Sequence, residues 1–142
     1  MDISGKTCVV TGANTGIGLE TARGLARGGA RVILCARDEA KGQRAVDDVK
    51  TSTENEAVEL CLFDLASLAS VREAAAELQE RCDALHVLVN NAGLILGDRR
   101  LTEDGFEATL GINHLGPFLF TRLLLPLLEK SAPARIVNVS ST

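Results

Sequence analysis

The segment Thr11–Gly18, which reads Thr-Gly-Ala-Asn-Thr-Gly-Ile-Gly, decides how the rest of the chain is organised. The largely apolar run Lys6–Val10 before it is typical of a buried strand. The residues Leu19–Arg27 after it place small and apolar side chains on one helical face. A strand, a glycine-rich turn and a helix N-terminus in this order predict a phosphate site, because the free amides and the dipole of a first helical turn attract negative charge.

Three glycines of this segment have separate predicted roles. Gly12 permits the tight turn, Gly16 lets the backbone approach a pyrophosphate, and Gly18 lets the helix pack on the strand. Their spacing is Gly-x-x-x-Gly-x-Gly, which differs from the Gly-x-Gly-x-x-Gly of ordinary dinucleotide folds. Glycines also mark plain turns, and at this point that interpretation stays open.

The composition is that of one globular domain. With 142 residues the chain is long enough to bury a core, and its net charge of −4 comes from interspersed acids and bases. The sequence has no cluster of basic residues that would favour nucleic acid as a partner. The sequence shows no signal peptide and no apolar stretch that would span a membrane, so we expect a cytoplasmic location.

Four cysteines are spread along the chain without the Cys-x-x-Cys spacing of metal or redox sites. They are Cys8, Cys35, Cys61 and Cys82. Three of them lie in apolar, strand-like runs, so we expect small buried thiols, with neither a metal site nor a disulfide framework. The chain has no tyrosine.

Strand-like and helix-like segments alternate along the whole chain. Further strands are predicted at 31–36, 58–63, 86–89 and 135–139, and helices at 39–50, 68–78 and 102–130. Asp38 and Ser67 are the predicted N-caps of the first two of these helices, and 51–56 is predicted to be a polar break. This alternation predicts an α/β fold with a doubly wound parallel sheet, in a single Rossmann-like domain over 1–142 that stops after about the fifth strand.

Later motifs extend the pattern begun by the glycine-rich turn. Asn90-Asn91-Ala92-Gly93 follows a buried strand, Asn113-His114-Leu115-Gly116 lies in the long predicted helix, and Ser140-Ser141 follows the last strand. With these motifs the chain resembles the short-chain dehydrogenase/reductase family over essentially all its residues, which correspond to roughly the N-terminal half of a member. The run Leu101–Glu107 together with Asn113–Gly116 is most similar to the retinol dehydrogenase-like branch.

The resemblance implies a dinucleotide-binding site made of residues from several loops. These residues are Gly12, Asn14, Thr15, Gly16, Ile17, Gly18, Arg37, Asp64, Leu65, Asn91, Ala92 and Gly93. Asp64 matches the acid that the family places beside the adenine ring, although the same residue is equally suited to start a turn. The amides of Asn90–Gly93 are expected to tie neighbouring strands together beneath the cofactor.

Cofactor choice depends on the residues that end the second strand. An acid at this place binds the ribose 2′-hydroxyl of NAD, whereas an arginine accommodates the 2′-phosphate of NADP. Ala36 stands where NAD-preferring members of the family carry their acid, and Arg37 follows it with a donor fork that suits phosphate. We therefore predict NADP(H), with NAD(H) as the less favoured cofactor. The alternative is a solvated Arg37 paired with Asp38 or Glu39.

Two residues have implied catalytic roles. The second serine of the family's pair maps to Ser141, where the hydroxyl would donate a hydrogen bond to the substrate oxygen. Asn113 would hold a water of the proton relay through its backbone carbonyl, which Pro117 deprives of its usual helical partner. A simple proline kink with Asn113 as a bystander is the alternative. The family's acid/base is a tyrosine in Tyr-x-x-x-Lys, and this chain contains none.

These features predict an oxidoreductase that transfers a hydride between NADP(H) and a small alcohol or carbonyl substrate, present here as an N-terminal piece. Without the tyrosine we expect this N-terminal piece to be inactive by itself. We also expect that the full-length protein can form a homo-oligomer. The alternative is a non-catalytic module that binds a dinucleotide. A P-loop NTPase is disfavoured because no Gly-Lys-Ser/Thr follows the glycine-rich turn.

Overall fold

The computed structural model describes residues 1–141, so of the predicted domain only Thr142 lies outside the described residues. The strands in this range are β1 (Thr7–Thr11), β2 (Arg31–Ala36), β3 (Val58–Leu62), β4 (Val87–Asn90) and β5 (Arg135–Asn138). The helices are α1 (Gly16–Arg27), α2 (Glu39–Thr53), α3 (Leu68–Arg81), α4 (Ala108–Leu110) and α5 (Gly116–Lys130), with a π-helical turn η1 (Gly111–Leu115) joining the last two. Every predicted strand is confirmed to within one residue at each end.

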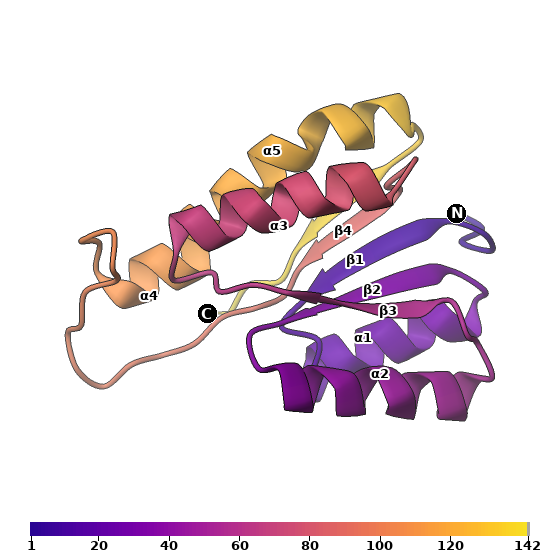
Figure 1. Ribbon diagram of the computed structural model, residues 1–142, viewed down its shortest axis with the longest axis horizontal. Coiled ribbons are helices and arrows are strands. Elements are labelled where there is room, and N and C mark those ends of the chain that lie inside the picture. Colours follow the sequence, from indigo (N-terminus) through magenta and orange to yellow (C-terminus); the bar gives the residue numbers. More distant parts are fainter. Residues whose placement is uncertain (142) are drawn as a thin grey trace.

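The five strands form one parallel sheet in the order β3-β2-β1-β4-β5. Helices α1 and α2 cover one face, and α3 and α5 cover the other (Figure 1). The predicted doubly wound sheet is therefore confirmed. The strand order changes direction between β1 and β4, and open sheets of this kind bind ligands beside such a switch point, at the carboxyl ends of the strands.

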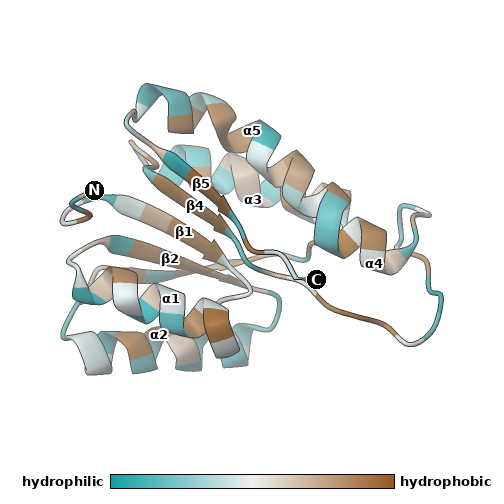
Figure 2. Cartoon of the chain, turned by 180° about the vertical axis from the view of Figure 1, so that it is seen from behind, coloured by the Kyte–Doolittle hydropathy of each residue, from teal (hydrophilic) through white to brown (hydrophobic). Residues whose placement is uncertain are grey.

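Two apolar layers hold the helices to the sheet. Along β1, Val9 belongs to the cluster that includes Phe120 of α5, whereas Cys8 and Val10 belong to the cluster under α1 and α2. The central strands are thus apolar on both faces, as parallel sheets require, and apolar colours continue through them in Figure 2. All four cysteines are free and buried, as predicted, and burial raises the pKa of the Cys8 thiol to about 11.

The predicted caps of α2 and α3 are confirmed. The Asp38 carboxylate accepts a hydrogen bond from the Lys41 amide at 2.9 Å, and the Ser67 hydroxyl accepts one from the Ser70 amide at 3.2 Å. The predicted polar break begins too early, because α2 runs on to Thr53. It ends at Glu54, whose φ of 55° lies in the left-handed region that does not continue a helix.

The prediction of one helix over 102–130 is wrong at its start, because 102–107 is not helical. The Thr102 amide donates to the Phe106 carbonyl at 2.7 Å and the Phe106 amide to the Thr102 hydroxyl at 3.2 Å, around Gly105 with a φ of +86°. Helix α4 begins only after Glu107, whose carboxylate accepts from the amides of the next helical turn. Apolar spacing continues through this turn, which is why the sequence pattern concealed it.

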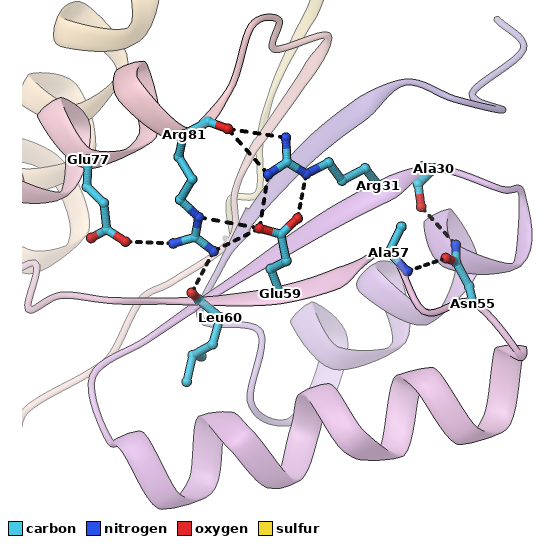
Figure 3. A network of polar contacts seen from close by, with 8 residues as sticks. All are labelled: Ala30, Arg31, Asn55, Ala57, Glu59, Leu60, Glu77 and Arg81. Carbon is cyan, nitrogen blue, oxygen red and sulfur yellow. Dashed lines mark hydrogen bonds and ion pairs between the residues drawn. The ribbon is translucent and has the colours of Figure 1, made fainter.

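The β3 edge of the sheet is covered by charged side chains from β2 and α3 (Figure 3). Glu59 of β3 accepts hydrogen bonds from Arg31 at 3.0 Å and from Arg81 at 3.2 Å. The Arg81 guanidinium also donates to the Leu60 carbonyl at 2.9 Å and to Glu77 at 2.6 Å. Hydrogen bonding to Arg31, more than to Arg81, lowers the pKa of the Glu59 carboxyl from its ordinary value. The arrangement is a partly buried charge network.

The β5 edge is different. All four residues of β5 are exposed, and Ile136, Val137 and Val139 remain 41–45% exposed at and just beyond it. Its apolar residues can be followed in Figure 2 beside β4. Across residues 1–141, no helix is both long enough and apolar enough to cross a membrane.

Candidate functional site

A cleft of about 430 Å³ opens at the carboxyl ends of β1 to β4, beside the switch point. Four segments line it, one at the end of each of these strands, together with Ile112 of η1. Ten of the twelve predicted dinucleotide-binding residues line this cleft: Gly12, Asn14, Thr15, Ile17, Arg37, Asp64, Leu65, Asn91, Ala92 and Gly93. The sequence motifs, far apart in the chain, are therefore brought to one place.

The other two predicted residues, Gly16 and Gly18, lie beside and beneath the cleft. Gly16 has a φ of +57° and nothing within 4 Å of the position that a Cβ would occupy, so its backbone faces open space. At Gly18 a Cβ would collide with the carbonyl of Gly12 and the side chain of Asn91. Gly12 itself has a φ of +61° and would place a Cβ 2.8 Å from the Cα of Ala92. Gly12 and Gly18 leave no room for a Cβ, whereas Gly16 favours glycine because of its left-handed backbone.

A threonine that we did not predict joins the two central loops. The Thr11 hydroxyl accepts hydrogen bonds from the amides of Asn91 and Ala92, both at 3.0 Å, and donates to the Val89 carbonyl at 3.4 Å. The Asn91 side chain donates in return to the carbonyls of Thr11, at 3.1 Å, and Gly12, at 3.3 Å. The predicted tie between neighbouring strands therefore runs through Asn91 and Thr11.

Arg37 lines the cleft at the end of β2. Within residues 1–141 it forms no ion pair, so the alternative pairing with Asp38 or Glu39 is not adopted. The Asp38 carboxylate instead caps α2, and the hydrogen bond from the Lys41 amide lowers the pKa of Asp38 from its ordinary value. The guanidinium of Arg37 is consequently available to a ligand.

Asp64 starts a turn and also lines the cleft, while its predicted place beside an adenine ring stays a prediction. Its carboxylate accepts a hydrogen bond from the Ala66 amide at 2.8 Å and so starts a turn. Its own amide donates to the Ser70 hydroxyl at 2.9 Å, which anchors the turn to α3. Held in this way, Asp64 and Leu65 line the cleft after β3.

The two predicted catalytic residues lie outside the lining of the cleft. Asn113 is in η1, and its side chain pairs with the backbone of Leu94, accepting from the amide at 2.9 Å and donating to the carbonyl at 2.7 Å. The turn before Pro117 is π-helical rather than a plain kink, with the Gly116 amide donating to the Gly111 carbonyl. Ser141 follows β5 and is exposed. Their catalytic roles stay predictions.

Ala36, which the sequence linked to cofactor choice, also lines the cleft, and five further residues of its wall were not predicted: Thr11, Cys35, Phe63, Leu94 and Ile112. Most of them directly adjoin a predicted residue, so continuity along each loop was the available signal. Ile112 differs from the others because it belongs to η1, which the hydrogen bonds between Asn113 and Leu94 connect to the loop after β4.

The model of the short chain dehydrogenase family matches residues 6–142. The chain belongs to this family. Retinol dehydrogenase 12 of Mus musculus is 49% identical over 141 residues, which are 99% of this chain and 45% of that protein. Retinol dehydrogenase 13 of Homo sapiens is 51% identical over 139 residues, 98% of this chain and 42% of that protein. This short-chain dehydrogenase sequence therefore spans less than half the length of these relatives.

Solved structures of the family have the same fold. The Pseudomonas aeruginosa RhlG/NADP active-site complex is 34% identical, with a TM-score of 0.84 over 99% of this chain and 56% of that one. A metagenomic short-chain oxidoreductase in complex with NADP is 31% identical, with a TM-score of 0.86 over 100% of this chain and 65% of that one. The predicted family and its retinol dehydrogenase-like branch are thus confirmed.

Proposed function

We propose that this chain forms the dinucleotide-binding part of an oxidoreductase that prefers NADP(H) and acts on an alcohol or carbonyl substrate. The observation that carries the cofactor preference is the end of β2. Ala36 and Arg37 both line the cleft there, and within residues 1–141 the Arg37 guanidinium has no ion-pair partner. A planar donor fork recognises phosphate, whereas the acid that would bind a free ribose hydroxyl is replaced by Ala36.

The residues of the cleft fit a dinucleotide. The first turn of α1 contains no acidic residue, so its amides and dipole meet no competing charge from the helix itself. The backbone at Gly16 faces open space, which leaves room for a pyrophosphate. When bound, the dinucleotide supplies or accepts the hydride. In the proposed reaction Ser141 donates a hydrogen bond to the substrate oxygen, and the Asn113 carbonyl positions a water.

The relatives support a substrate of the alcohol or aldehyde class, since several bear the name retinol dehydrogenase. Because these 142 residues contain no tyrosine, we propose that they do not turn over such a substrate by themselves. A positioned acid/base typically contributes about a hundredfold to ten-thousandfold in rate, and Ser141 can only donate a hydrogen bond. A cytoplasmic location and a homo-oligomeric parent remain proposals of the same kind.

Calorimetric titration of the 142-residue chain with NADP⁺ and NAD⁺ tests the cofactor preference. A charge-assisted contact contributes about 1.5–3 kcal/mol, so NADP⁺ should bind roughly tenfold to a hundredfold more tightly. The double variant Ala36→Asp with Arg37→Ala should reverse the order. Arg27→Ala, an exposed change at the far end of α1, serves as the control and should leave both affinities unchanged. Equal affinity of the unmodified chain for the two dinucleotides would contradict the proposal.

A further inference from the structure

Two of the four cysteines are direct neighbours across the sheet. Cys35 of β2 and Cys61 of β3 are partners in the parallel register, and both belong to the apolar cluster that includes residues of α3 and α5. Neighbouring strands lie about 4.8 Å apart, which is within the Cα separations of about 4.4–6.8 Å that a disulfide spans. The backbone therefore places these two side chains on one face of the sheet, at a separation that permits a bond between them.

The two thiols also interact with each other. The Cys35 thiol donates a hydrogen bond to the Cys61 sulfur, and this bond lowers the pKa of Cys61 while it raises that of Cys35. The charge of Arg81, whose guanidinium donates to the Leu60 carbonyl at 2.9 Å (Figure 3), also lowers the pKa of Cys61, whereas burial and Glu77 act against it. The thiolate is the reactive form of cysteine, so Cys61 is the nucleophile of the pair and Cys35 its proton-bearing partner.

The pair lies at the wall of the cleft. Among the cysteines of residues 1–141, only Cys35 lines the cleft, directly before Ala36 and Arg37. Cys61 is 1% exposed, so a small molecule in the cleft meets Cys35 first and Cys61 behind it. Cys8 belongs to the apolar cluster on the opposite face of the sheet. The cleft therefore gives a reagent access to one particular pair of thiols.

We propose that Cys35 and Cys61 are a redox-sensitive pair, which a hydroperoxide entering the cleft converts into a disulfide between β2 and β3. The bond would join the two strands whose ends carry Arg37 and Asp64 into the cleft. The redox state of the surroundings would thus be recorded at the dinucleotide-binding edge of the sheet.

The chemistry needs one peroxide for each pair. The Cys61 thiolate attacks one peroxide oxygen, the O–O bond breaks, and the departing hydroxide takes up the proton that Cys61 released. The Cys35 sulfur then attacks the sulfenic acid of Cys61, the S–O bond breaks, and the oxygen leaves as water with the Cys35 proton. Two thiols lose two electrons in total, and one hydrogen peroxide is reduced to two waters.

Peptide mapping of the folded 142-residue chain after treatment with hydrogen peroxide tests the pairing. Trypsin cuts the chain so that Cys35 falls in 32–37, Cys61 in 51–72, Cys82 in 82–99 and Cys8 in 7–23. After remaining thiols are blocked with iodoacetamide, we expect 32–37 linked to 51–72, two thiols lost out of four, and full recovery with dithiothreitol. A link between 51–72 and 82–99, or four unreacted thiols, would overturn the proposal.

Variants identify the two sulfurs independently. Cys35→Ala and Cys61→Ala should each abolish the disulfide. Cys8→Ala is the matched control, because Cys8 is equally buried on the other face of the sheet, and it should form the disulfide at an unchanged rate. A disulfide that persists in Cys35→Ala would contradict the assignment. The map of the unmodified chain decides the pairing even where a variant fails to fold.

The route through the cleft is tested with NADP⁺, and this part rests on the proposed function. At ten times the dissociation constant measured by calorimetry, about one cleft in eleven is empty, so disulfide formation should slow about tenfold. Bound NADP⁺ that leaves the rate unchanged would overturn the route while the proposed function stands. A chain that does not bind NADP⁺ would refute the proposed function, and the peptide map would still decide the pairing.

Discussion

The two edge strands of the sheet, β3 and β5, have similar lengths but different surroundings. At β3 the guanidinium of Arg81 donates to the Leu60 carbonyl, and Glu59 holds two arginines over the strand. At β5 no comparable side chain within residues 1–141 covers Ile136 or Val137, which are 41% and 45% exposed. Charged side chains are a common protection of a free edge, whereas an exposed apolar strand is a site of association. The comparison predicts that β3 is an outer edge of the sheet and that the chain associates through β5.

The largest expected effect is on self-association through β5. We expect the 142-residue chain to associate, and Val137→Lys to weaken the association by about a hundredfold, since two symmetry-related apolar contacts of roughly 1.5 kcal/mol each are lost. Leu62→Lys is the matched control, because Leu62 of β3 is 39% exposed. This substitution should leave the association unchanged. Sedimentation velocity over a concentration series measures both. If the unmodified 142-residue chain is monomeric, or if Leu62→Lys dissociates it and Val137→Lys does not, the predicted difference between the two edges is wrong.

The next effect concerns the charge network at β3. Glu59→Gln removes the carboxylate shared by Arg31 and Arg81, whose side chains are 31% and 21% exposed. Leaving partly buried guanidinium groups unpaired should lower the free energy of unfolding by about 1–3 kcal/mol. The matched change at β5, Arg135→Gln, should cost less than about 0.5 kcal/mol, since within residues 1–141 the Arg135 guanidinium donates only to the adjacent Ala134 carbonyl. Urea unfolding in a Val137→Lys background measures both, and equal losses would contradict the prediction.

The smallest effect is a difference in pH response between the two sides of the sheet. His86, whose carbonyl accepts the Arg135 amide of β5 at 2.8 Å, uses its Nδ1 to accept the Thr7 amide at 3.0 Å. Burial, together with the charge of Lys6, lowers the pKa of His86 below its ordinary 6.5. The unfolded chain therefore takes up this proton at higher pH than the folded one, and the stability present above about pH 6.5 is lost as the pH falls.

Between pH 7 and pH 5 we expect His86 to cost about 1 kcal/mol or less, the net worth of one hydrogen bond. Glu59 has its pKa lowered from 4.5, so the network at β3 should lose stability only at more acidic pH. His86→Gln, which keeps an acceptor near Thr7, should flatten the dependence between pH 7 and pH 5 and leave the acidic part unchanged. Unfolding free energies at pH 7, 5 and 3 test this, and an unaltered slope in His86→Gln would exclude His86 as its source.

Much of this fold was predictable because local and global signals agree. The central strands β1, β2 and β4 are short apolar runs buried on both faces, and the caps Asp38 and Ser67 are set by hydrogen bonds within one helical turn. The turn around Gly105 was not predictable, because its apolar residues keep a helical spacing while the backbone bonds between Thr102 and Phe106 interrupt the helix. Periodicity reports which residues face the core, and it does not report where the backbone turns.

The site was predictable where a motif forms one loop and unpredictable where two loops meet. Asn91 and Gly12 were assigned from motifs, yet the hydroxyl that joins their loops belongs to Thr11. Likewise the pairing of Asn113 with the backbone of Leu94 spans a gap of nineteen residues. Such contacts depend on how strands are ordered in the sheet, which no short stretch of sequence specifies.

The Thr11 hydroxyl has a consequence for how the cleft opens. The hydroxyl accepts hydrogen bonds from the amides of Asn91 and Ala92, which lie about eighty positions later in the chain. Neither loop can therefore loosen without breaking the hydrogen bonds that join it to the other loop. Their hydrogen-exchange protection should therefore follow the separation of β1 from β4 rather than the mobility of either loop. A ligand that bridges the two loops would in turn slow exchange through the centre of the sheet, so occupancy of the cleft and cohesion of the sheet are thermodynamically linked.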